Sequence, residues 1–150
     1  MISRVFPHAG ALLALVLGMG LASAAPAVER RVGVEAPATV AAGAPIQVVL
    51  IASTDAGQGE QIGLFQADFS VDGGRTWEGL CYLDKVGPET RQERTLTAGP
   101  SGTVVKVRLR VAFRDGLAGD VDYRGAALRW SGSWTKWAEP PARWVTVAVK

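Results

Sequence analysis

Histidine and cysteine are nearly absent from this chain, and their scarcity excludes most metal-based and nucleophilic chemistry. One of the 150 residues is a histidine, His8, and one is a cysteine, Cys81. Because His8 lies in the expected signal peptide described below, the rest of the chain has no imidazole for a Ser-His or Cys-His pair, a zinc site or a pH switch near neutrality. We therefore expect a protein that is not an enzyme and that uses no cofactor.

The single cysteine also excludes an intramolecular disulfide. In an exported protein a disulfide would otherwise be available to stabilise a small domain. The hydrophobic core has to stabilise this fold unaided, and we expect Cys81 to be a small buried apolar group within it.

A strong excess of one charge is lacking as well. The chain has 16 Lys and Arg residues against 14 Asp and Glu residues, which gives a formal net charge of +2. Arg4 belongs to the expected signal peptide, so the remainder carries about +1, from 15 basic and 14 acidic residues. A nucleic-acid-binding domain usually has a clear basic excess, and we expect no nucleic-acid partner.

Long hydrophobic runs are confined to the N-terminus. Arg4 precedes an apolar run over residues 9–21, and Ala22-Ser23-Ala24 fits the small-x-small cleavage pattern of a signal peptide. The run is shorter than the roughly 18 to 20 residues of a membrane-spanning helix. We expect residues 1–24 to be a signal peptide, residues 25–150 to form a single domain with no membrane span after cleavage, and the product to be secreted or periplasmic.

Helical periodicity is not found, and alternation of period two takes its place. In residues 103–113 apolar side chains fall on one face, and Lys106, Arg108 and Arg110 fall on the other. Residues 64–71 alternate in the same way and lead through a glycine-rich turn into a returning strand at residues 76–83. We expect further strands at residues 31–35, 46–53, 91–97, 127–130 and 144–149. Short strands separated by turn residues predict an all-β fold, a two-sheet antiparallel β-sandwich of about seven strands.

The turn of this hairpin carries a recognisable motif. Residues Ser70-Val71-Asp72-Gly73-Gly74-Arg75-Thr76-Trp77 resemble the Asp box, S-x-D-x-G-x-T-W, which occurs repeatedly in sialidases and singly in other secreted β proteins. The resemblance implies a structural role. Asp72 would accept hydrogen bonds from turn amides, Gly73 and Gly74 would adopt positive φ, and Trp77 would fold back as an apolar plug.

A second motif lies near the C-terminus. The tract Trp134-Thr135-Lys136-Trp137-Ala138 resembles the W-S-x-W-S region of fibronectin type III domains in class I cytokine receptors, with threonine and alanine in place of the two serines. In that family the tryptophans interleave with arginines of the neighbouring strand. The resemblance implies an immunoglobulin-like or fibronectin type III-like sandwich in which Trp134 and Trp137 stack on Arg108 and Arg110. The absence of a Cys…Trp…Cys framework favours the fibronectin branch.

Tryptophan is the residue type that most directly suggests binding. Of the five tryptophans, four lie between residues 130 and 144. They form either a binding surface or a cap on the core that stacks on arginines. The binding residues that we expect are Trp130, Trp134, Trp137, Arg108 and Arg110.

Three functions share this fold. The first is a noncatalytic exported interaction module that presents the Trp-rich loop from Arg114 to Pro141 to a protein partner. The second is a carbohydrate-binding module, which a coplanar row of exposed rings would favour and rings held among arginines would disfavour. The third is a structural accessory subunit of an envelope or extracellular assembly, which an exposed strand edge or a large apolar patch would favour.

Three carboxylates in the same loop form a weak calcium candidate. Asp115, Asp120 and Asp122 lie in a glycine-containing segment, and calcium prefers oxygen ligands. Their spacing departs from that of an EF-hand loop, so we expect no metal.

Overall fold

The computed structural model describes residues 26–57, 59–84, 86–115, 121–122, 129–130 and 136–150. These residues form strands, with no helix among them, and the described part of the chain accordingly contains no helix that could cross a membrane. The expected signal peptide, residues 1–24, and Trp134 lie outside the described residues.

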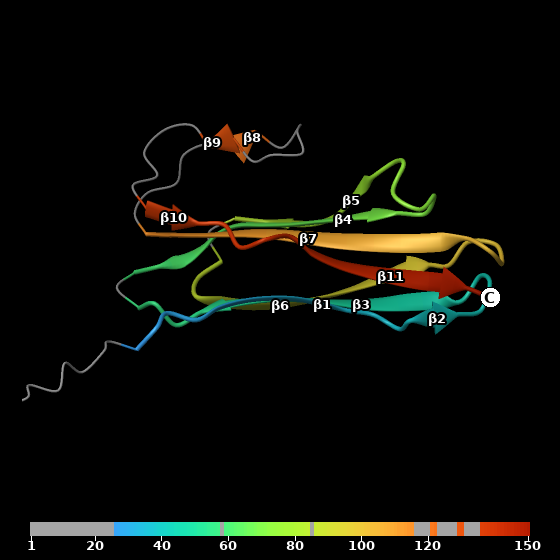
Figure 1. Cartoon of the computed structure of the whole chain (residues 1–150), viewed down its shortest axis with the longest axis horizontal. Coiled ribbons are helices and arrows are strands. Elements are labelled where there is room, and N and C mark those ends of the chain that lie inside the picture. The colour runs from blue at the N-terminus through green and yellow to red at the C-terminus, as the bar shows by residue number, and fades with distance from the viewer. Residues whose placement is uncertain (1–25, 58, 85, 116–120, 123–128, 131–135) are drawn as a thin grey trace, which may run out of the picture.

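Two sheets pack against each other as the layers of a sandwich (Figure 1). The small sheet is antiparallel and has the order β1 (Arg30–Glu35), β3 (Pro45–Thr54), β6 (Glu89–Thr97). The large sheet has the order β2 (Thr39–Val40), β11 (Arg143–Val149), β7 (Val104–Asp115), β4 (Gln61–Ser70), β5 (Glu78–Leu83). Its pairs are antiparallel except for the parallel pair of β2 with β11. The expected all-β sandwich is confirmed.

The core lies between the inward faces of the two layers. Because successive side chains of a strand point to opposite faces, one residue in two contributes to it. Its fully buried residues include, from β3 and β7, Ile46, Val48, Leu50, Ala52, Val105, Val107 and Leu109. Burying such side chains stabilises a fold by about 1.5 to 3 kcal/mol each, which is how a chain without disulfides holds this shape.

The polar side chains that alternate along β7, Arg108 and Arg110 among them, lie on the outer face of the large sheet. Arg108 pairs with Asp68 of β4 on one side and with Trp144 of β11 on the other. Arg110 pairs with Gln66 of β4. Because directly opposed residues share a face, these side chains from three strands are brought together away from the core.

Three features differ from the expected strand list, and the first is β2 (Thr39–Val40), which lies in none of the expected strands. The segment expected near residues 127–130 contains only β9 (Arg129–Trp130) among its described residues, and β9 pairs with β8 (Val121–Asp122) and belongs to neither layer. In addition, β10 (Lys136–Ala138) pairs with the end of β7, with Trp137 opposite Arg114. Strands of two or three residues are too short to show alternation, so the sequence pattern did not indicate them.

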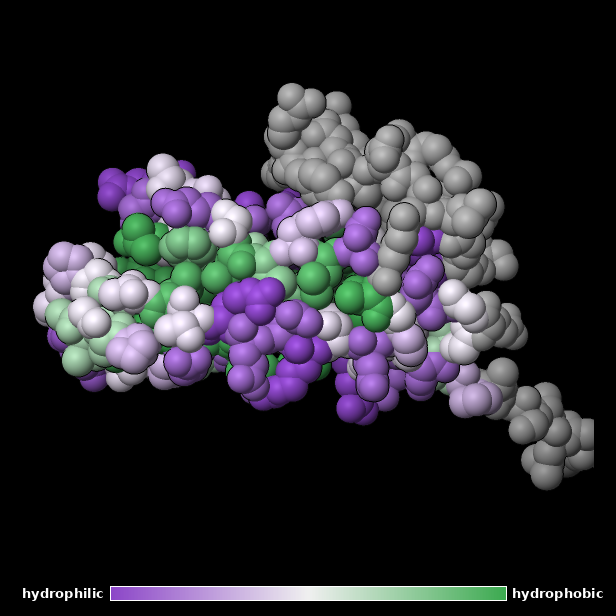
Figure 2. Space-filling view, turned by 180° about the vertical axis from the view of Figure 1, so that it is seen from behind, coloured by the Kyte–Doolittle hydropathy of each residue, from purple (hydrophilic) through white to green (hydrophobic). Residues whose placement is uncertain are grey.

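One side of the sandwich is formed by the edge strands β5 and β6. Arg94 of β6 donates from Nη2 to the Sγ of Cys81 in β5 at 3.0 Å, which links the two layers there. Figure 2 views the molecule from this side and shows a band of hydrophobic side chains between the layers, with hydrophilic side chains gathered on the lower layer.

Candidate functional site

Arg108 lies between two tryptophans on the outer face of the large sheet. Its Cζ is 4.3 Å from the ring centroid of Trp77 and 5.8 Å from that of Trp144. The two rings are 5.4 Å apart between centroids and are inclined at 76°, an edge-to-face arrangement. The Nε of Arg108 donates to Oδ2 of Asp68 at 2.9 Å. We call these four residues, Trp77, Arg108, Trp144 and Asp68, the outer-face cluster.

Register and a turn together assemble this cluster. The antiparallel pairing of β7 sets Arg108 opposite both Asp68 and Trp144. Trp77 instead comes from the turn before β5, where its indole N–H donates to the carbonyl of Gly74 at 3.1 Å. The cation–π contacts therefore depend on the hairpin keeping its shape.

Asp72 organises that hairpin turn. Its Oδ1 accepts from the Ser70 hydroxyl at 2.7 Å and from the Thr76 amide at 2.9 Å, and its Oδ2 accepts from the Thr76 hydroxyl at 2.6 Å. Gly73 and Gly74 have φ of 76° and 101°, which side chains other than glycine rarely adopt. These hydrogen bonds, of which those from Thr76 have the largest effect, hold the pKa of Asp72 well below its usual range. The hydrogen bonds and backbone angles expected from the motif are confirmed.

Asp68 is a buried residue whose carboxylate forms ion pairs with two arginines. Besides Arg108, the Nη2 of Arg110 lies 3.5 Å from its Oδ2, and Gln66 donates from Nε2 to its Oδ1 at 3.2 Å. Burial lowers the pKa of Arg110, and the charge of Arg108 acts in the same direction, while Asp68 and Glu139 oppose the shift. The carboxylate therefore compensates two partly desolvated cations.

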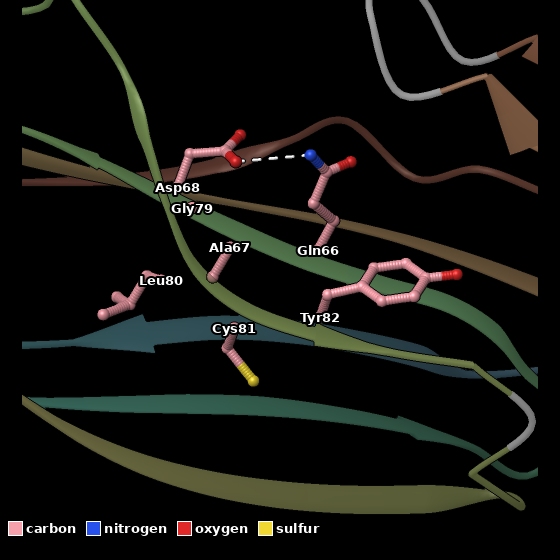
Figure 3. Close-up of a pocket in the computed structure, with 7 residues that line it drawn as sticks. All are labelled: Gln66, Ala67, Asp68, Gly79, Leu80, Cys81 and Tyr82. Carbon is pink, nitrogen blue, oxygen red and sulfur yellow. Dashed lines mark hydrogen bonds between the residues drawn. The ribbon is translucent and has the colours of Figure 1, made fainter.

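A hollow of about 400 Å³ adjoins the cluster between β4 and β5. Its lining comprises Gln66, Ala67, Asp68, Gly79, Leu80, Cys81 and Tyr82. Figure 3 shows Gln66 and Asp68 joined by their hydrogen bond, and Cys81 pointing away from them. Gly79 leaves space here because a Cβ at that position would meet nothing within 4 Å. Asp68 belongs to both the hollow and the cluster, so the two form one continuous surface.

Among the described residues, Arg108 contacts Trp77 and Trp144, neither of which the resemblance named as its partner. Trp134 lies outside the described residues. For Trp130 in β9 and Trp137 in β10 only the backbone is described. The predicted stacking of Trp134 and Trp137 therefore remains a prediction.

The sequence held part of the signal for these two contacts of Arg108. Trp77 closes the Asp-box-like turn, and that turn follows the strand that pairs with β7. Trp144 is brought to Arg108 by the register of β11 with β7, and no spacing within the sequence records that register. The sequence shows that Trp144 begins an alternating strand, but it does not show which residue Trp144 faces.

The remaining candidate groups contribute little to this surface. Cys81 is buried, as expected, and burial raises the pKa of its thiol while Arg94 opposes the shift. The calcium candidates stay a prediction, because Asp120 lies outside the described residues and only the backbone of Asp115 and Asp122 is described. Elsewhere in the described residues, no group of three His, Cys, Asp or Glu side chains is arranged to hold a metal ion.

Comparisons with protein-family models, with curated proteins and with solved structures found no match to this chain. The described surface offers one half-exposed indole, a stacked guanidinium, a shared carboxylate and an adjoining hollow, which together suit recognition of a ligand.

Proposed function

We propose that this protein is a noncatalytic exported module that binds a protein partner through the outer-face cluster. The observation that carries the proposal is the setting of Trp144, which is 56% exposed and stands next to Arg108 and Trp77 on a sheet. Tryptophan and arginine dominate the binding energy of protein interfaces. A side chain already held by its neighbours loses less conformational entropy when it binds.

The adjoining hollow supplies the polar part of the proposed interface. Tyr82 is 47% exposed, and the partly buried Gln66 and the buried Asp68 line the hollow beside it. The surface from Trp144 to Tyr82 crosses β11, β7, β4 and β5. An aromatic anchor beside hydrogen-bonding groups is the usual composition of an interface centre and its rim.

We also include the Trp-rich loop from Arg114 to Pro141 in the proposed interface. Asp115 of β7 pairs with Lys136 of β10 in the large sheet, so these two residues, both within the loop, are neighbours. Loops anchored on a rigid scaffold commonly carry recognition.

We further propose that the sandwich belongs to the fibronectin type III or immunoglobulin-like group. Its support is the packing of a three-stranded sheet on a larger antiparallel sheet, each with core residues in alternation. The Asp-box-like turn and the W-S-x-W-S-like tract are the sequence features that agree with this assignment.

Carbohydrate binding is the second candidate. The exposed ring of Trp144 beside a polar hollow favours it. Against it, Trp77 and Trp144 are inclined at 76°, so they do not form a coplanar platform, and Arg108 covers one face of Trp77. A protein partner therefore remains the better supported ligand.

The test compares Trp144→Ala with Thr146→Ala, which alters another exposed residue on the same face of β11. Each purified variant would be immobilised and exposed both to exported proteins of its own organism and to a glycan array. We expect a protein ligand that the wild type and Thr146→Ala retain and whose binding Trp144→Ala weakens at least tenfold. Glycan binding that depends on Trp144 would establish the second candidate instead. Retention of every ligand by Trp144→Ala would reject the proposed site.

A further inference from the structure

The outer edge of β6 is the long strand edge that the proposed function leaves unused. The strand is last in the small sheet, and no strand among the described residues pairs with its outer side. All its outward-facing side chains are polar and exposed: Glu89, Arg91, Glu93, Thr95 and Thr97. An open edge of this length is a template for pairing with another strand.

Hydrogen bonding to β3 shows which backbone groups of β6 face outward. Ala98 donates to the carbonyl of Ala44, and Thr54 donates to the carbonyl of Pro88. In an antiparallel pair such bonded positions recur at every second residue. The even-numbered residues of β6 therefore bond to β3, and the N–H and C=O groups of the odd-numbered residues point to the free edge. These are the same residues whose side chains are exposed.

The charges on this edge alternate in a way that suits a second β6 strand. In an antiparallel pair of identical strands with Gln92 at the twofold axis, Arg91 of each copy lies opposite Glu93 of the other. Opposed residues of unlike charge stabilise such pairs. Within one chain Arg91 already reaches Glu93 of its own strand, at 3.5 Å with both side chains more than half exposed, so both charged groups are accessible to a second copy.

Other registers are disfavoured by the same charges. Moving one strand by two residues places Glu93 opposite Glu93, and moving it the other way places Arg91 opposite Arg91. Like charges directly opposed are destabilising. Charged edges generally discourage pairing with arbitrary strands, and this alternation makes the edge selective for its own copy in one register.

We propose that two copies of this chain form a homodimer by antiparallel pairing of their β6 strands, with Arg91 of each opposite Glu93 of the other. The pairing is isologous, as a twofold interface requires. The carbonyl of Glu93 already accepts from Nη1 of Arg94 at 2.8 Å. A carbonyl has two lone pairs, so it can also accept the N–H of the opposing Arg91.

An apolar seam next to β6 supplies further contact area. Leu83 and Val86 pack against the core but are only partly buried, and hydrophobic side chains are visible between the layers on this side of the molecule (Figure 2). A twofold axis at β6 brings the two seams toward each other. The dimer leaves the outer-face cluster on the opposite layer free, so this inference goes beyond the proposed binding site and does not depend on it.

The experiment is sedimentation equilibrium of the purified chain and three variants. We expect the wild type to dimerise. Arg91→Glu and Glu93→Arg, measured separately, should each be monomeric, with a dimer affinity reduced at least tenfold. An equimolar mixture of these two variants should form a heterodimer, because the reversed charge at position 91 of one variant then faces the reversed charge at position 93 of the other. The double variant with both changes should dimerise as the wild type does.

A matched control lies on the other edge of the same sheet. Glu35 is exposed on β1, and Glu35→Arg should leave dimerisation unchanged. Circular dichroism would show that every variant keeps its β structure. A monomeric wild type would overturn the proposal, and so would a dimer that both single charge reversals leave intact, since its interface would then lie elsewhere.

Discussion

Asp68 is the residue on which the outer-face cluster depends most. It is buried, and its carboxylate orients Arg108 over Trp77 while it compensates the charge of Arg110. Removing one partner of a buried charge pair is costly because the other charge is left without compensation. The cluster therefore links stability of the sheet to the geometry of the proposed site.

Replacing Asp68 should accordingly affect both stability and the indole environment. We expect Asp68→Ala to lower the free energy of unfolding by about 3 kcal/mol and to change the fluorescence of Trp77, because Arg108 loses its anchor. Urea denaturation followed by tryptophan emission measures both effects. The exposed Glu78→Ala on β5 is the control and should change stability little. A loss below about 1 kcal/mol, the range of surface ion pairs, would contradict this role.

At the scale of elements, alternation predicted the long strands, and it failed for the short ones. In β3 and in the first half of β7, buried positions alternate with less buried ones, so their sequences indicate both their existence and their inward face. In contrast, β2, β8 and β10 have two or three residues and are defined by pairing with a neighbour. The contact of Arg108 with Trp144 is of the same kind, because it follows from register between strands distant in the sequence.

The hairpin between β4 and β5 is the element whose stability we expect to fall at low pH. Hydrogen bonds hold the pKa of Asp72 below its value in the unfolded chain. The stabilisation they give is therefore present above the unfolded value of about 3.9, and it is lost as the pH falls toward the folded value.

We expect acidification from about pH 6 to about pH 3 to destabilise the wild type more than Asp72→Asn, which cannot titrate at this position. Urea midpoints measured at several pH values give the difference directly. The other carboxylates contribute equally to the pH dependence of both proteins, so their effects cancel in the comparison. Equal acid sensitivity of the two proteins would show that Asp72 does not stabilise the turn in its ionised form.

At the scale of the whole molecule, the two sheets place two surfaces on different layers. The outer face of the large sheet carries the aromatic and cationic cluster, and the small sheet ends in the charged β6 edge. A dimer joined at β6 would carry two copies of the cluster. Bivalent presentation raises the apparent affinity for a partner that offers two epitopes, without any new contact.

The most direct test is site-specific photo-crosslinking from a position beside the outer-face cluster. A benzophenone amino acid would replace Thr146, an exposed neighbour of Trp144 on the same face of β11, in one protein and Arg31, an exposed residue of β1 in the small sheet, in another. Both would be irradiated in the exported-protein fraction of the organism. We expect a defined protein adduct from position 146 that position 31 does not form. Identical adducts from both positions, or none from position 146, would show that this face does not bind a protein.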